Sequence, residues 1–178
     1  RAQAEMAPRA RAEMAPPGPA QWAERAERAE RALEARAEYW LGYVFYALGQ
    51  ARDAVAHCER AAALAGPGND ALAVQIRATL GQAKAAAADY AGAEPLLADA
   101  VAIKRRHRRG SRASVGLAYS LVCLASVVGD RGEFERAHEL FDEARRLVNG
   151  ATHEIGASIS GWRAVVLGWQ GRWAEALA

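Results

Sequence analysis

The sequence predicts an all-α protein, an α-solenoid of about four antiparallel helix pairs with the last pair truncated. Alanine, the residue with the highest helix propensity, accounts for 45 of the 178 residues, whereas glycine and proline together number only 22. Aromatic residues are 7% of the chain and β-branched residues are sparse, which argues against a β-sandwich or barrel. A pattern of small and apolar residues also recurs every 39 to 44 residues, a period typical of helical solenoids.

Each copy of this pattern opens with a small residue and reaches an alanine five positions later. In three copies an aromatic residue lies between the two, and we expect it to fill the space near the turn. These aromatic residues are Tyr90, Phe134 and Trp173. The alanines are Ala54, Ala93, Ala137 and Ala176, and they are 39, 44 and 39 residues apart.

Two further sets of small residues keep the same register. Seven positions before each opening residue stand Gly42, Gly81, Ala125 and Ala164. Seven positions after the first three alanines of the pattern stand Ala61, Ala100 and Ala144. Two helices approach closely only where side chains are small, so we expect the earlier set to meet the alanines of the pattern where the two helices cross. The later set should face the next pair.

The N-terminal part of the chain divides into two segments. Residues 1–19 contain four of the six prolines and a near-exact duplication of eight residues, which predicts an arm or linker. Residues 20–34 contain the triplet Ala-Glu-Arg three times, which predicts a charged, alanine-rich helix. We expect helix across 20–48, either unbroken or interrupted near Ala35.

The repeat domain is predicted over 35–178, with pairs at 35–68, 70–109, 113–150 and 153–178. Glycine, proline and asparagine punctuate the turns between its helices. Pro95 lies inside one predicted helix and should bend it slightly. The chain stops inside a predicted helix, so we expect a piece of a longer protein whose open last pair self-associates. The helices are predicted at 51–65, 70–86, 89–107, 113–129, 133–148, 153–169 and 172–178.

The first pair resembles the tetratricopeptide repeat. Leu41-Gly42, Phe45, Ala54-x-x-x-Cys58 and Pro67 match that family's pattern. The resemblance extends over about residues 35–178. It implies an α-solenoid that binds proteins or peptides and whose first helices line a concave surface.

The longer spacing and the segment Tyr90–Leu97 resemble the kinesin-light-chain-like subtype of this family. The chain departs from the family where Ala51 replaces an aromatic residue and Arg163 replaces a leucine; Cys58 and Leu97 also stand where an aromatic residue is common. The match therefore predicts the fold more strongly than any particular partner.

Two aromatic-rich stretches, 39–43 and 161–173, resemble the C-terminal repeat regions of large bacterial signalling ATPases and cyclases. Related repeats also occur in bacterial transcription activators. The resemblance implies a signalling or regulatory scaffold. Arginine outnumbers lysine 21 to 2, which fits a bacterial source with a GC-rich genome.

Composition and motif searches argue against several function classes. The net charge of +2 is too small for a globally basic nucleic-acid binder. The longest uncharged stretch, 113–129, is too short and too polar to span a membrane. The two cysteines cannot form a disulfide framework and fit a reducing, cytoplasmic location. No metal-ligand spacing or phosphate-binding loop occurs, so we expect neither a cofactor nor an enzyme.

The predicted partner-binding groove is lined by the first helix of each pair. Tyrosine and tryptophan there offer large, rigid contact areas with a polar tip, which suits them to anchor a protein or peptide partner, although some could instead pack the solenoid. Cys123 could line this groove, whereas Cys58 falls on an apolar core position. The candidates are Arg36, Tyr39, Tyr43, Tyr46, Gln75, Thr79, Gln82, Tyr119, Cys123, Ser126, Trp162 and Trp169.

A basic run near the end of the predicted helix 89–107 has two interpretations. Cations at a helix C-terminus offset the helix dipole, and this is the simpler one. The alternative is a contact for an anion, an acidic protein segment or a nucleic acid. One loop is too short to follow a nucleic-acid backbone far, so a nucleic acid is the less favoured partner. The residues are Lys104, Arg105, Arg106, Arg108, Arg109 and Arg112.

Overall fold

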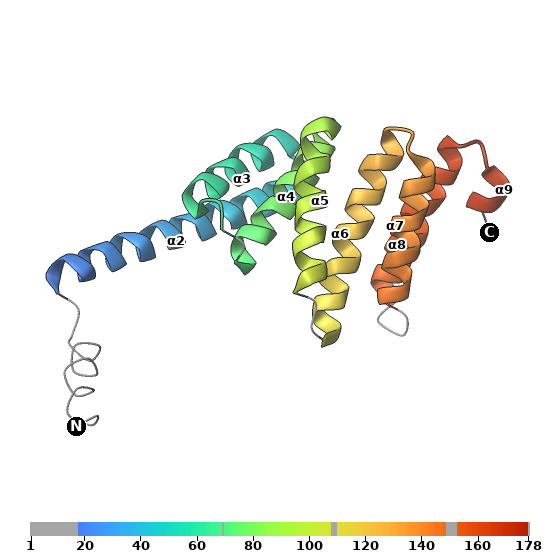
Figure 1. Cartoon of the computed structure of the whole chain (residues 1–178). Coiled ribbons are helices and arrows are strands. Elements are labelled where there is room, and N and C mark those ends of the chain that lie inside the picture. Colours follow the sequence, from blue (N-terminus) through green and yellow to red (C-terminus); the bar gives the residue numbers. More distant parts are fainter. Residues whose placement is uncertain (1–17, 69, 108–109, 149–152, 178) are drawn as a thin grey trace, which may run out of the picture.

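The computed structural model describes residues 18–68, 70–107, 110–148 and 153–177, and within these ranges it contains eight α-helices and no strand (Figure 1). The prediction of an all-α protein is therefore confirmed, and the helix bounds agree with the predicted ones to within three residues. The helices are α2 (Pro19–Ala47), α3 (Ala51–Ala65), α4 (Ala71–Ala86), α5 (Tyr90–Arg106), α6 (Gly110–Asp130), α7 (Phe134–Leu147), α8 (His153–Trp169) and α9 (Trp173–Ala176).

Helix α2 runs unbroken through Ala35, which settles the alternative that the sequence left open. Its N-terminal half projects away from the other helices (Figure 1), and residues 18–34 are all exposed. Glu–Arg pairs four residues apart line this half, as expected from the repeated triplet, with Glu24–Arg28 at 4.0 Å and Glu27–Arg31 at 3.7 Å. Such exposed pairs add only a few tenths of a kcal/mol each, roughly 0.2–0.5.

The small residue that opens each copy of the pattern has a backbone role. Gly49, Gly132 and Gly171 have φ angles of 74°, 83° and 73°, and Ala88 has a φ of 64°. These four residues lie in the turns that join α2 to α3, α4 to α5, α6 to α7 and α8 to α9. Left-handed backbone favours glycine because a Cβ is strained there. The recurring small residue therefore marks the same turn in every pair.

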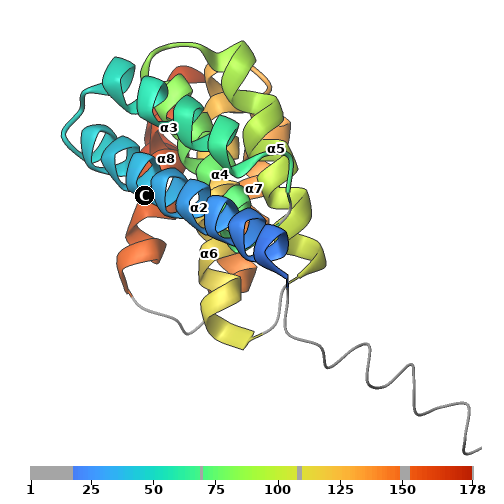
Figure 2. The same ribbon diagram turned by 90° about the vertical axis from the view of Figure 1, so that its left-hand side faces the viewer.

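Each helix packs mainly on its neighbours along the chain. The contacts are most extensive within α2–α3, α4–α5 and α6–α7, and the first helices also touch from pair to pair, α2 on α4, α4 on α6 and α6 on α8. Within the described ranges, helices whose backbones approach closely are never more than two positions apart in the chain. The pairs therefore form a row (Figure 1), and Figure 2 looks along it with α2 and α3 nearest the viewer.

The predicted small residues lie at close helix crossings in the first two pairs. Gly42 faces Ala54, and a Cβ added to it would lie 3.3 Å from the carbonyl oxygen of that residue. Gly81 stands in the same relation to Ala93, also at 3.3 Å. Both alanines are fully buried, as is Ala137 in the third pair.

In the third pair Ala125 and Ala137 are both fully buried in the same apolar cluster. Gly129, one helical turn after Ala125, also approaches Ala137, with 3.6 Å between the position of an added Cβ and the alanine methyl group. Ala164 and Ala176 are only partly buried, because no described helix covers the outer side of α8 and α9.

The alanines expected to face the next pair, Ala61, Ala100 and Ala144, have different surroundings. Ala61 packs with Tyr39 and with Ile76 of the next pair, as expected. Ala100 instead clusters with Val74 and Ala78 from α4, the first helix of its own pair. Ala144 joins the largest apolar cluster, which extends from α5 to α8 and includes, partly buried, Tyr90 and Phe134.

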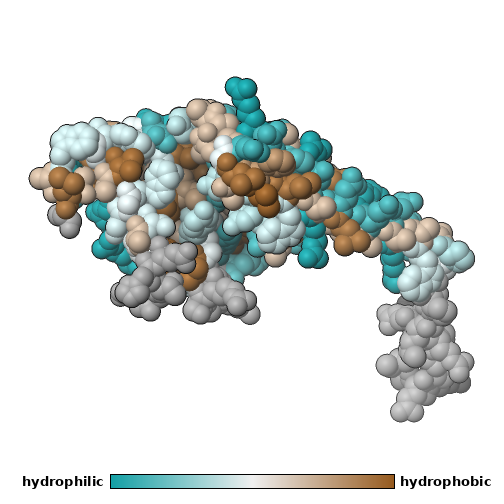
Figure 3. Space-filling view, turned by 180° about the vertical axis from the view of Figure 1, so that it is seen from behind, coloured by the Kyte–Doolittle hydropathy of each residue, from teal (hydrophilic) through white to brown (hydrophobic). Residues whose placement is uncertain are grey.

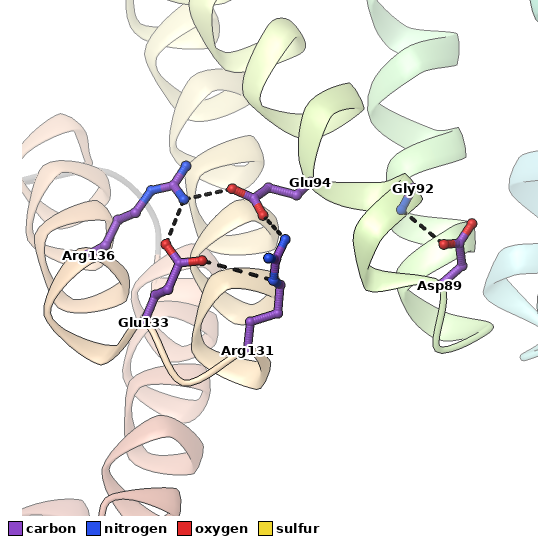
Figure 4. Close-up of polar contacts among 6 residues, drawn as sticks. All are labelled: Asp89, Gly92, Glu94, Arg131, Glu133 and Arg136. Carbon is purple, nitrogen blue, oxygen red and sulfur yellow. Dashed lines mark hydrogen bonds and ion pairs between the residues drawn. The ribbon is translucent and has the colours of Figure 1, made fainter.

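Polar contacts support the N-terminal end of α5 and link it to the following pair (Figure 4). Asp89 accepts a hydrogen bond from the backbone N–H of Gly92 at 2.9 Å and so caps the helix. Glu94 accepts from Arg131 at 2.5 Å and from Arg136 at 2.6 Å, and these arginines stand at the end of α6 and the start of α7. The carboxylate of Glu94 therefore connects consecutive pairs.

Candidate functional site

A groove of about 490 Å³ runs across the first helices of the pairs. Its walls come from α2, α4, α6 and α8, with two residues, Tyr90 and Leu97, contributed by α5. We call it the aromatic groove. Seven of the twelve predicted groove residues line it, namely Tyr46, Gln82, Tyr119, Cys123, Ser126, Trp162 and Trp169.

One end of the aromatic groove is built from tyrosines of α2 and α6. Burial raises the pKa of Tyr46 and, more strongly, that of Tyr119, and each hydroxyl is a hydrogen-bonding partner of the other. Both phenols are therefore neutral in the physiological pH range. They can donate and accept hydrogen bonds while their rings offer apolar area. The other end carries two tryptophans from α8, Trp162 and Trp169, which are 44% and 45% exposed.

The thiol of Cys123, which lines this groove, is expected to be unreactive at neutral pH. Burial raises the pKa of Cys123 to about 12, although Lys104 nearby acts in the opposite direction. The thiol is therefore protonated at neutral pH, and a protonated thiol is a poor nucleophile. Cys58 lies under Gly42, fully buried, and burial raises its pKa to about 11. It occupies the core position that the sequence predicts.

Asp130 is the only charged side chain among the described residues that line the aromatic groove. Burial raises its pKa, because leaving water disfavours the charged form. In the described part of the chain no cationic group lies within ion-pair distance of it. Asp130 is exposed, so a cationic group from a bound partner could reach its carboxylate at this point.

Five predicted groove residues lie elsewhere. Tyr39 and Thr79 are buried and hydrogen-bonded to each other between α2 and α4, so they join these helices rather than face a ligand. Gln75 lines a separate hollow beside Lys104 and His107. Arg36 and Tyr43 are exposed on α2 and do not line the groove, although Tyr43 is close enough to raise the pKa of Tyr119.

Seven groove residues were not predicted from the sequence: Ala85, Ala86, Tyr90, Leu97, Val122, Asp130 and Ser158. Of these, Asp130 could have been found, since it follows Tyr119, Cys123 and Ser126 at the helical spacing of four, three and four residues. The two residues from α5 could not, because their exposure to the groove depends on how α5 tilts against α4 and α6.

The three described members of the basic run, Lys104, Arg105 and Arg106, do not converge on one surface. The ammonium group of Lys104 turns into the protein and donates to the hydroxyl of Ser120 at 2.7 Å and to the carbonyl of Gly116 at 3.4 Å, and burial lowers its pKa. Arg105 binds Glu143 on α7, with 3.0 Å between Nε and the carboxylate. Arg106 is exposed. Arg108 and Arg109 lie outside the described residues, as does the side chain of Arg112.

Among the placed histidine, cysteine and acidic side chains, no group of three or more is arranged to hold a metal ion. None of the helices in the described ranges combines the length and the apolar character needed to cross a membrane.

The structure thus defines an all-helical chain of consecutively packed pairs with an aromatic groove across the first helices. Comparison with known proteins finds no family model that matches this chain and no curated protein that matches it.

Proposed function

We propose that this chain is an α-solenoid of tetratricopeptide-like repeats and that it acts as a non-catalytic scaffold for protein–protein interaction. Three features support the fold proposal: close backbone approach only between helices at most two positions apart in the chain, small residues at the first crossings, and a left-handed residue at the same turn of every pair. The resemblance of its aromatic stretches to bacterial signalling ATPases favours a place in a regulatory protein.

The proposed ligand is an extended peptide or a partner-protein segment held in the aromatic groove. The observation that carries this proposal is the meeting of Tyr46, Tyr119, Trp162 and Trp169 from three helices that are far apart in the sequence. Half-buried aromatic side chains of this kind dominate the free energy of peptide binding. The volume of about 490 Å³ accommodates a few side chains, not a whole folded domain.

The charge of the groove narrows the ligand class further. Because Asp130 is its one charged lining residue in the described ranges, we propose that the peptide combines apolar or aromatic residues with a lysine or arginine that reaches Asp130. Because Asp130 is exposed, this ion pair would add little affinity, and its main effect would be to select the sign of the charge on the peptide. A peptide with an acidic residue at that point should be rejected.

Selection from a random peptide display library tests this proposal. We expect the selected peptides to contain aromatic or aliphatic residues and a basic residue. Trp162→Ala should weaken their binding at least tenfold, as truncation of an interface aromatic does. Asp130→Asn should weaken only the peptides that carry the basic residue.

The matched control is Trp22→Ala, which removes a similarly exposed tryptophan outside the groove and should leave affinity unchanged. If the library yields no binder, or if the selected peptides bind Trp162→Ala as tightly as the parent chain, the groove is not the site.

A further inference from the structure

Helix α2 is apolar on two opposite faces, and only one of them is covered. Ala35, Tyr39 and Gly42 form the buried face, against α3 and α4. On the opposite face lies a second set of large apolar side chains, each between 48% and 65% exposed. We call this set the α2 stripe, and it consists of Trp22, Leu33, Trp40, Val44 and the capping residue Leu48.

The α2 stripe is straight and long. At 100° per residue its five members fall within about 80° of one another around the helix axis, and they extend along roughly 39 Å of helix. Between them the same sector of the helix carries Ala26 and Ala37, with Glu30 at its edge in line with Leu48, and all three are exposed. In Figure 3 the projecting part of the helix carries mostly hydrophilic side chains, with a few apolar ones among them, and apolar side chains gather where it joins the rest of the molecule. Small residues between large ones let a second helix approach closely.

The charges beside the stripe are sorted by sign. By helical position, Arg25 and Arg36 lie on one flank, whereas Glu30 and Glu34 lie on the other. Two copies of such a helix that pair in parallel bring the basic flank of each beside the acidic flank of the other. An antiparallel pair would instead bring like charges together. The stripe is therefore complementary to a parallel copy of itself, as in two-stranded coiled coils.

The area available is sufficient for a dissociable dimer. An aromatic side chain buries about 150–250 Å², so two half-exposed tryptophans and three aliphatic side chains offer roughly 600 Å² per copy. A standard protein interface buries about 800 Å² per partner. Because the stripe points away from α3 and α4, the rest of each copy stays on the outer sides of the helix pair.

We infer that the α2 stripe pairs two copies of this chain through a parallel α2–α2 contact. In this dimer Arg25 of one copy lies beside Glu30 of the other, on both sides of a two-fold axis parallel to the helices. The contact leaves the aromatic groove open, because Tyr46 lies on the opposite side of α2, near the buried face. The inference is independent of the proposed peptide binding, and it also differs from self-association through the last pair.

Analytical ultracentrifugation over a wide range of protein concentrations tests the inference. The parent chain should show a reversible monomer–dimer equilibrium. The double variant Leu33→Glu/Trp40→Glu should raise the dissociation constant at least tenfold, and circular dichroism should show unchanged helix content because both side chains are exposed. The control Trp173→Glu, at the opposite end of the row, should leave the dimer intact. A parent chain that stays monomeric, or a dimer lost only in the control, would overturn the inference.

Orientation is tested by a cysteine placed on the stripe. Ala26→Cys should form a disulfide-linked dimer under mild oxidation, because residue 26 faces itself in a parallel pair. In an antiparallel pair centred on the stripe, the two copies of residue 26 would be roughly 27 Å apart and could not link. The native cysteines do not interfere, since both thiols are protonated. Failure to cross-link, with dimerisation retained, would overturn the parallel arrangement.

Charge exchange provides a second check that does not depend on apolar substitutions. Glu30→Arg alone should weaken the dimer, because it places an arginine beside Arg25 of the other copy. The double variant Arg25→Glu/Glu30→Arg should restore it. If the double variant dimerises no better than Glu30→Arg, the flank pairing is wrong.

Discussion

Gly81 in α4 lies directly against Leu97 in α5. A Cβ added to Gly81 would stand 2.7 Å from Cγ of Leu97, well inside van der Waals contact. Leu97 is fully buried in the largest apolar cluster and has little freedom to withdraw. The missing side chain at position 81 is therefore what allows α4 and α5 to cross at this distance.

We predict that Gly81→Ala destabilises the protein by about 1–2 kcal/mol. Alanine alone would favour the helix by about 0.5–1 kcal/mol, but overpacking a filled core costs about 1–3 kcal/mol and outweighs that gain. Urea unfolding followed by circular dichroism measures the difference.

Gly161→Ala is the matched control for this substitution. Gly161 is exposed within α8, and nothing lies within 4 Å of the position of its added Cβ. No steric contact then offsets the higher helix propensity of alanine, so the free energy of unfolding should rise by about 0.5–1 kcal/mol. Equal effects of the two substitutions would show that α4 and α5 do not cross at Gly81.

The turn between α4 and α5 offers a stabilising substitution. Ala88 has a φ of 64°, where the other three turns have glycine. A left-handed conformation costs a residue with a Cβ about 1–2 kcal/mol, and part of this is offset by the greater freedom of glycine in the unfolded chain. We expect Ala88→Gly to raise the free energy of unfolding by roughly 0.5–1 kcal/mol and Gly132→Ala to lower it. The melting temperatures of both variants test this prediction. A lower melting temperature for Ala88→Gly than for the parent chain would contradict it.

A pH dependence follows from the contact between α2 and α3. Glu38 binds His57 at 2.7 Å and Arg60 at 3.0 Å, and these hydrogen bonds, led by that from His57, lower the pKa of Glu38 although its partial burial opposes the shift. A carboxylate with a lowered pKa in the folded state stabilises the protein above its pKa in the unfolded chain, about 4.3. That contribution disappears as the pH falls through the folded-state pKa.

Glu38→Gln should therefore lower the melting temperature at neutral pH, and the difference from the parent chain should shrink below about pH 4. The control Glu139→Gln changes an exposed carboxylate on α7 and should have little effect at either pH. A Glu38→Gln deficit that stays constant across this pH range would contradict the assignment.

Local signals in the sequence were sufficient for the helices and for part of the packing. Capping and turn residues mark where each helix ends, and the small residues at 42, 81, 54 and 93 mark two crossings. At the third crossing Gly129, one helical turn after Ala125, also approaches Ala137. The repeated spacing does not point to this second close residue.

The groove was predictable only where one helix presents its residues to it. Tyr119, Cys123 and Ser126 follow helical spacing on α6, and all three line the groove. Tyr39 and Thr79 fit the same register but are buried, because α4 packs against α2 at that level. Lys104 likewise belongs to a basic run in sequence, yet its side chain reaches Ser120 on α6. Helix tilt and side-chain reach decide these cases, and neither is encoded locally.

The most direct test of the account uses the five tryptophans as reporters. Trp162 and Trp169 line the aromatic groove, whereas Trp22, Trp40 and Trp173 lie outside it. Each gives one indole N–H signal in a ¹H–¹⁵N spectrum, which can be assigned by single substitutions and followed while a selected peptide is added. The account predicts that the signals of Trp162 and Trp169 move and that the other three stay in place. Movement of the other three, with those of Trp162 and Trp169 unchanged, would contradict it.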